Sequence, residues 1–109
     1  MRYLLVSLAL SISATAATAG NLATCILDKA PSAKNDHVAD LIAAECYKAN
    51  PGGMAVIVKG SGRGFFGYKS VEECAMKKGQ DTPSAKAGYI IHVACNCLYG
   101  EPASDKLTC

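Results

Sequence analysis

The stretch CAMKKGQDTPSAKAGYIIHVAC, residues 74–95, has a cysteine at each end and helix signals on both sides of a turn. Directly before it, SVEE at 70–73 has the pattern of a capping box that begins a helix. Gly79 ends this helix, and Thr82-Pro83 begins a second one, because proline is favoured in the first turn. We expect the second helix to reach about Tyr99. Its predicted buried positions are Tyr89, Ile90, Val93, Ala94 and Leu98.

The same cysteine spacing occurs in CILDKAPSAKNDHVADLIAAEC, residues 25–46. At an offset of 49 residues, Lys29 aligns with Lys78 and Ile42 aligns with Ile91. Matching apolar positions favour a duplicated unit, and chance spacing among the cysteines is the alternative. Helix signals also recur: Asn21 precedes one apolar stretch, and Asn35 or Asp36 precedes the next. The apolar positions predicted on this last helix are Val38, Leu41, Ile42 and Ala49.

In each of the two units, around residues 25–46 and 74–95, the sequence therefore predicts two helices joined by a turn, with one cysteine on each helix. A disulfide would then close each hairpin, contributing about 3 kcal/mol in the chain-entropy description. The predicted fold class is mostly α with a small β-hairpin (α+β). The predicted organisation is a signal peptide at 1–19 followed by one domain at 20–109. Within the domain, the predicted parts are repeat one (21–51), a glycine-rich hairpin (52–69), repeat two (70–100) and a tail (101–109). The predicted disulfides are Cys25–Cys46, Cys74–Cys95 and Cys97–Cys109.

Cys95 and Cys97 are separated by a single residue and could form a redox pair, part of a metal site or halves of two separate disulfides. Residues two apart on a helix point about 200° from each other, which disfavours a bond between them. A redox dithiol usually has the spacing C-x-x-C, which these residues lack. A metal site would need further ligands, and only His37 and His92 are available besides other cysteines. Two separate structural disulfides are therefore favoured, and thiol-redox or metal-handling roles are the alternatives.

Six of the ten glycines fall within residues 52–67, between the two units. The run MAVIV at 54–58 and the aromatic run FFGY at 65–68 have the composition of strands, and GSGRG at 60–64 has that of a turn. We expect a β-hairpin that packs on the helices. A phosphate-binding loop is disfavoured, because neither a Gly-Lys-Ser/Thr nor a G-x-G-x-x-G motif is present.

Arg63 is the only arginine after residue 2, and it lies between glycines close to Phe65 and Tyr68. An exposed guanidinium beside aromatic side chains is typical of a contact with a sugar, a carboxylate or a protein partner. The predicted binding residues are Arg63, Phe65 and Tyr68. The alternative is that the phenylalanines fill the core and that Arg63 is only solvated.

The first residues, MRYLLVSLALSISATAATAG, have a positive start, an apolar run and the small-x-small pattern of Ala17 and Ala19. This pattern predicts a secretory signal peptide that is cleaved before Gly20. An uncleaved membrane anchor is an alternative, although the apolar run is short for a span of about 20 residues. Lipidation at Cys25 is another, although Thr24 fits poorly before a lipidated cysteine.

After removal of residues 1–19, the chain has ten basic and nine acidic residues, which gives a net charge of +1. This balance gives no electrostatic reason to expect a nucleic acid or an acidic membrane as partner. A core of about 90 residues is marginal in stability, and disulfides are the usual support in exported proteins. The predicted location is therefore the periplasm or the extracellular space, with no membrane span after cleavage.

No arrangement in the sequence predicts catalysis. There is no G-x-S-x-G motif, and six paired cysteines would leave no thiolate nucleophile. A hydrolase that uses His92 or His37 is the weaker alternative. The predicted function is a small exported, non-enzymatic binding module without a cofactor, whose partner is an unknown protein or envelope component.

Overall fold

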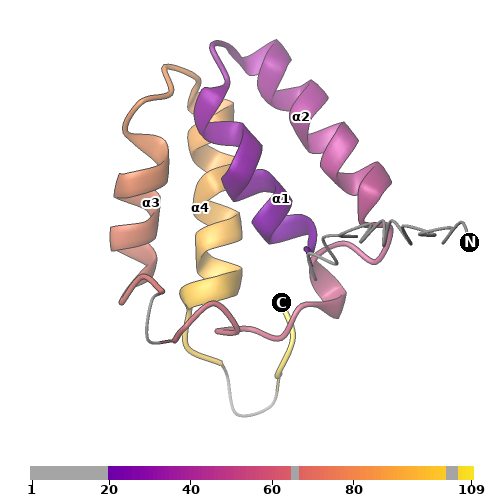
Figure 1. Cartoon of the computed structure of the whole chain (residues 1–109), viewed down its shortest axis with the longest axis vertical. Helices are drawn as coiled ribbons and strands as arrows, with labels where there is room; N and C mark the ends of the chain where they lie inside the picture. Colours follow the sequence, from indigo (N-terminus) through magenta and orange to yellow (C-terminus); the bar gives the residue numbers. More distant parts are fainter. Residues whose placement is uncertain (1–19, 65–66, 103–105) are drawn as a thin grey trace, which may run out of the picture.

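The computed structural model describes residues 20–64, 67–102 and 106–109, and within these ranges the chain is mostly helical (Figure 1). The predicted signal peptide lies outside the described residues. The described ranges contain four α-helices and two short 3-10 helices, with no strand. The elements are α1 (Leu22–Lys29), η1 (Ala30–Ser32), α2 (Asp36–Ala49), η2 (Met54–Val56), α3 (Val71–Gly79) and α4 (Ala85–Tyr99).

Helix α4 is the centre of the fold, because it contacts α1, α2 and α3 (Figure 1). Its inner face alternates large and small residues, and Ile91 is completely buried. Leu22 at the start of α1 is also completely buried. The main core consists of Leu22, Ala23, Ile26, Leu27, Ala30, Cys46, Ile57, Cys74, Ile91, Ala94, Cys95, Cys97 and Leu98. Within the described ranges, no helix is both long enough and apolar enough to cross a bilayer.

Polar side chains begin the two helices of the first unit, as the sequence predicts. The Asn21 side chain accepts a hydrogen bond from the Thr24 amide (2.9 Å), and the Thr24 hydroxyl accepts one from the Asn21 amide (2.8 Å). Together they form a capping box that the sequence analysis missed, because threonine replaces the usual Glu or Gln. Asn35, rather than Asp36, caps α2 through the Val38 amide (2.9 Å).

The caps of the second unit differ in detail from the prediction. Ser70 caps α3 through the Glu73 amide (3.0 Å), but the Glu73 carboxylate accepts from the Lys69 amide instead of closing a capping box. Helix α4 is capped by Ser84 and begins two residues after Pro83, so the predicted cap at Thr82 is wrong. The Thr82 hydroxyl donates instead to the Ala33 carbonyl (2.6 Å), which connects the two helical pairs.

The starts of corresponding helices lie 49 residues apart in the two halves. Leu22 and Val71 begin α1 and α3, and Asp36 and Ala85 begin α2 and α4. A disulfide of 21-residue separation joins the helices of each pair. These positions agree with the offset read from the sequence, but the duplication itself stays a prediction.

The predicted β-hairpin at 52–69 is wrong for the residues that the structure describes. Met54–Val56 forms a 3-10 turn, and Val58 forms an isolated antiparallel bridge with Thr108 in the C-terminal tail. The Cys109 amide donates to the Ile57 carbonyl at 2.9 Å. The physical reason is the disulfide Cys97–Cys109, which holds the tail beside residues 57–59 and makes it the pairing partner.

Three positions that the sequence predicts on apolar helix faces are exposed: Tyr89 (68%), Leu41 (57%) and Ala49. Tyr89 and Leu41 lie two residues from a completely buried position, Ile91 and Ala39 respectively, and residues two apart point about 200° from each other on a helix. The buried faces of α2 and α4 are therefore narrower than the apolar pattern predicts.

Candidate functional site

All six cysteines lie in described residues and all are in disulfides. The pairs are Cys25–Cys46, Cys74–Cys95 and Cys97–Cys109, with Cα–Cα distances of 5.7, 5.7 and 5.5 Å. These are the pairs that the spacing predicts. Cys95 is completely buried against α3, whereas Cys97 holds the tail. The two cysteines both lie on α4 but are bonded to different parts of the fold, and in this disulfide state they form no dithiol.

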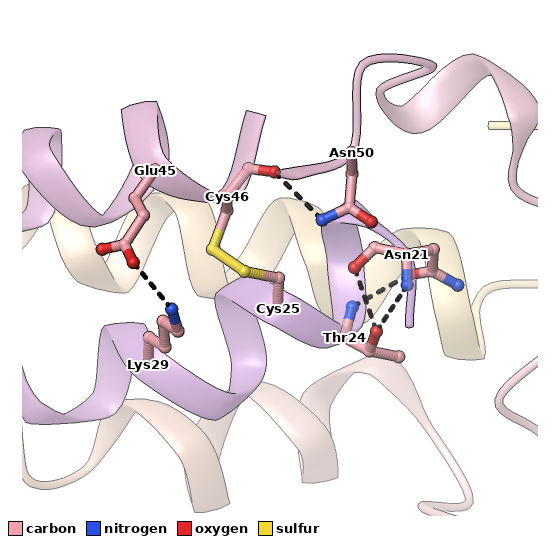
Figure 2. The surroundings of a disulfide bond; sticks show 7 residues. All are labelled: Asn21, Thr24, Cys25, Lys29, Glu45, Cys46 and Asn50. Atoms are coloured by element: carbon pink, nitrogen blue, oxygen red, sulfur yellow. Dashed lines mark hydrogen bonds and ion pairs between the residues drawn. A yellow bond between two sulfur atoms is a disulfide. The ribbon is translucent and has the colours of Figure 1, made fainter. Parts of the chain in front are cut away.

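Polar contacts lie on both sides of the Cys25–Cys46 disulfide, one between α1 and α2 and one within the end of α2 (Figure 2). On one side, the Lys29 ammonium lies 3.2 Å from a Glu45 carboxylate oxygen. On the other side, the Asn50 amide donates to the Cys46 carbonyl at 3.0 Å and so covers the end of α2. The ion pair is largely exposed and adds little stability, so the covalent bond is the main connection.

The glycine-rich segment covers the C-terminal end of α4. The Gly60 amide donates to the Cys97 carbonyl and the Gly62 amide to the Leu98 carbonyl, both at 2.8 Å. The last carbonyls of a helix have no partner within the helix, so these two bonds satisfy groups that are otherwise left to water. The segment therefore uses its amides on the protein itself, which argues further against an anion-binding loop.

Glycine is required at position 60 by the backbone conformation and at position 62 by close contacts with α4. Gly60 has φ +83°, a conformation that glycine adopts without strain. A Cβ on Gly62 would lie 2.9 Å from the Leu98 Cβ, 2.9 Å from the Tyr99 Cε1 and 3.0 Å from the Leu98 carbonyl oxygen. The glycine composition that suggested a hairpin turn thus reflects close packing against α4.

Arg63 directly follows this anchored turn and is exposed. Its amide donates to the Gly60 carbonyl at 3.0 Å, and its side chain has no ion pair among the described residues. Tyr68 is half-buried, and its ring contacts that of Tyr99 edge-to-face with centroids 5.3 Å apart. Phe65, the third predicted binding residue, lies outside the described residues.

Tyr68 and Tyr99 line a shallow groove of about 420 Å³. Burial, followed by the nearby Tyr68, raises the pKa of Tyr99 above its ordinary value, so its hydroxyl stays protonated at neutral pH. Asp28 of α1 and Lys78 of α3 contribute one charge of each sign. The sequence analysis missed these two residues, because they become neighbours only when α1 and α3 pack around α4. The complete lining is Thr24, Leu27, Asp28, Tyr68, Lys78, Leu98 and Tyr99.

A polar cluster links the starts of α2 and α4. The Asp36 carboxylate accepts from the Ser84 hydroxyl at 2.6 Å and from the Lys86 amide at 3.2 Å. These bonds lower the pKa of Asp36, with the Ser84 bond contributing most. The Lys86 ammonium also pairs with Asp40. Because every member has a partner, this cluster is a structural link rather than a reactive site.

Neither histidine belongs to a catalytic arrangement in the described part of the chain. His37 on α2 and His92 on α4 are both exposed, and neither side chain forms a hydrogen bond or ion pair with a described residue. A catalytic histidine is normally oriented by a second group. The described residues also contain no group of three His, Cys, Asp or Glu side chains that could hold a metal ion.

Comparison of the chain with known protein families, characterised proteins and solved structures finds no match.

Proposed function

We propose that this chain is a small exported, non-enzymatic binding module that contacts a protein or envelope component through Arg63 and the neighbouring aromatic residues. Three disulfides within residues 20–109 indicate an oxidising environment, which exported proteins reach. The periplasm or the extracellular space is the proposed location, after cleavage of residues 1–19.

The proposal rests on one observation, which is that the backbone before Arg63 is bonded to the end of α4. The exposed guanidinium directly follows a turn whose Gly60 and Gly62 amides bond to the end of α4. Arginine loses less entropy on binding when its backbone is already fixed, and its planar fork binds carboxylates through two hydrogen bonds. The groove at Tyr68 and Tyr99 offers aromatic surface of the kind enriched in binding interfaces.

The module is proposed to consist of two copies of one helical hairpin. The equal offsets of the helix starts and of the two 21-residue disulfides support this. The glycine-rich segment joins the copies and covers the end of α4, so the contact surface lies on the connection between them. A duplicated, disulfide-closed scaffold suits a binding role because it holds a short loop in one conformation without chemistry of its own.

A pull-down from the native compartment tests the function, with the oxidised protein as bait. Once a partner is isolated, Arg63→Ala is expected to weaken its binding by about 1 kcal/mol or more. The same change is expected to alter the free energy of unfolding by less than about 0.5 kcal/mol, because the residue is exposed. Lys34→Ala is the matched control, since Lys34 is also an exposed cation in a loop. Unchanged partner binding by Arg63→Ala would refute the contact.

A further inference from the structure

A second cavity shares no lining residue with the groove at Tyr68. Its volume is about 200 Å³, and three parts of the chain form it: α4, η2 with the segment after it, and the C-terminal tail. The disulfide Cys97–Cys109 joins two of these parts, and the bridge between Val58 and Thr108 joins the tail to the third. Covalent and backbone bonds therefore join all three parts of the cavity wall in the folded, oxidised protein.

The lining of this cavity is divided into an apolar part and a cationic part. Met54, Val93 and the Cys97–Cys109 disulfide provide the apolar surface. Polar groups come from two lysines, an asparagine and a threonine, and no acidic residue among the described ones lines the cavity. These polar residues are Lys59, Asn96, Lys106 and Thr108.

Lys59 is held in position rather than freely solvated. Its amide donates to the Leu107 carbonyl at 2.9 Å, which places its backbone against the tail. Its aliphatic stem lies against Gly100, where an added Cβ would be 2.9 Å from the Lys59 Cε and 3.0 Å from the Asn96 Oδ1. The absence of a side chain at Gly100 thus makes room for both polar groups, and the lysine stem is partly buried while its ammonium stays available.

The two lysines of the cavity have no charged partner in the described part of the chain. Lys29 and Lys86, by contrast, each pair with a carboxylate. The end of α4 does not need Lys59 or Lys106 as a hydrogen-bond donor either. Its last carbonyls, those of Asn96, Cys97 and Leu98, accept from the amides of Gly100, Gly60 and Gly62.

From this arrangement we infer that the cavity binds a carboxylate carried on a short apolar chain. The carboxylate would lie between the Lys59 and Lys106 ammonium groups, where charge-assisted hydrogen bonds are strongest, and the chain would contact Met54 and Val93. A volume of 200 Å³ equals that of about seven water molecules at ~30 Å³ each, so the ligand has about seven non-hydrogen atoms. Either a free small acid or the terminal residue of a peptide provides this chemistry.

The test is a titration of the ¹⁵N-labelled, oxidised protein with sodium butyrate at constant ionic strength, followed by NMR. Saturable shifts are expected at the amides of Lys59, Asn96 and Thr108, and butyramide, which lacks the charge, is expected to give none. The double variant Lys59→Gln/Lys106→Gln should bind butyrate at least tenfold more weakly. The matched control Lys34→Gln/Lys77→Gln removes the same charge from exposed positions outside the cavity and should bind as the parent protein does.

A second titration distinguishes the two sources of the carboxylate. Acetyl-Ala-Val with a free C-terminus is compared with the same peptide as its amide, and with butyrate. Tighter binding of the peptide acid assigns the cavity to protein C-termini, and tighter binding of butyrate assigns it to free acids. Equal shifts with butyrate and butyramide, or equal weakening by both double variants, would overturn the inference.

The inference goes beyond the loop contact proposed above and fails separately from it. Arg63 does not line the cavity, so Arg63→Ala is expected to change the butyrate affinity less than twofold. The titration needs no isolated partner, and its result stands whether or not a pull-down finds one. An amide-resonance pattern like that of the parent protein in each variant verifies that the fold is retained.

Discussion

Replacing Gly62 with alanine tests the interpretation that the glycine-rich segment is packed against α4. The added methyl carbon would lie 2.9 Å from both the Leu98 Cβ and the Tyr99 Cε1, so the turn must move away from the helix. Overpacking of this kind costs about 1–3 kcal/mol. Losing the 2.8 Å bond from the Gly62 amide to the Leu98 carbonyl adds about 1 kcal/mol.

The loss of glycine also reduces the entropy of the unfolded chain, which offsets about 0.4–1 kcal/mol of this cost. The free energy of unfolding should therefore fall by about 2 kcal/mol. For a domain of this size, each kcal/mol corresponds to about 4–8 °C in melting temperature. Thermal unfolding of the oxidised protein, followed by far-ultraviolet circular dichroism, is thus expected to show a decrease of about 8–16 °C.

Gly88→Ala is the matched control, because it makes the same chemical change inside α4 where no atom beyond the adjacent residues and the nearby helix backbone lies within 4 Å of the new Cβ. Alanine is favoured over glycine in a helix by about 1 kcal/mol, so this variant should melt at a higher temperature. Opposite shifts in the two variants support the packing argument. A melting temperature for Gly62→Ala equal to or above that of the parent protein would refute it.

Three further predictions concern the disulfides, the polar cluster and the chain start. Replacing Cys74 and Cys95 together with alanine should cost about 3.3 kcal/mol for the 21-residue separation, measured by chemical denaturation, with a helical signal retained. Cys95→Ala alone should fold in lower yield, because the free Cys74 thiol attacks other disulfides; equal yields would contradict the pairing. Because its folded-state pKa is lowered, Asp36 stabilises the fold above about pH 4, and this contribution is lost as the pH falls through the folded-state pKa. Asp36→Asn should therefore flatten the stability profile on the acidic side, below about pH 5, and an unchanged profile would exclude the link to Ser84. Intact mass measurement of the protein from its native compartment should find a chain that starts at Gly20 or the next residue, and a chain that retains residue 1 would contradict export by cleavage.

The helices could be predicted from the sequence because their signals are local. Asn21, Asn35 and Ser70 each cap a helix through an amide three residues away, a distance that the chain alone determines. Two disulfide pairs, Cys25–Cys46 and Cys74–Cys95, also follow from sequence spacing, since cysteines on adjacent antiparallel helices meet at similar distances from the turn, and Cys97–Cys109 is the pair that remains. Sequence reasoning failed first at Thr82, whose hydroxyl bonds to Ala33, 49 residues away.

The candidate sites were less predictable than the helices. Arg63 was singled out by its sequence context and is exposed, and its binding role stays a prediction, whereas Tyr99, Asp28 and Lys78 in the groove were missed. No periodicity or motif connects these residues, because they come from different helices. Sequence patterns likewise do not indicate that Lys59 lines the cavity, because it does so only where the tail folds back beside it.

The sequence by itself determined the helical elements, the cysteine partners and the basic residue at the glycine turn, because each depends on neighbours along the chain. Only the tertiary structure decided what the glycine-rich segment and the tail do. The run at 54–58 has strand-like composition. A lone pair of short strands is only marginally stable in water, so the segment that pairs with this run is the one that other bonds hold beside it. Here the Cys97–Cys109 disulfide brings the tail to Ile57, while the carbonyls at the end of α4 take the amides of Gly60 and Gly62.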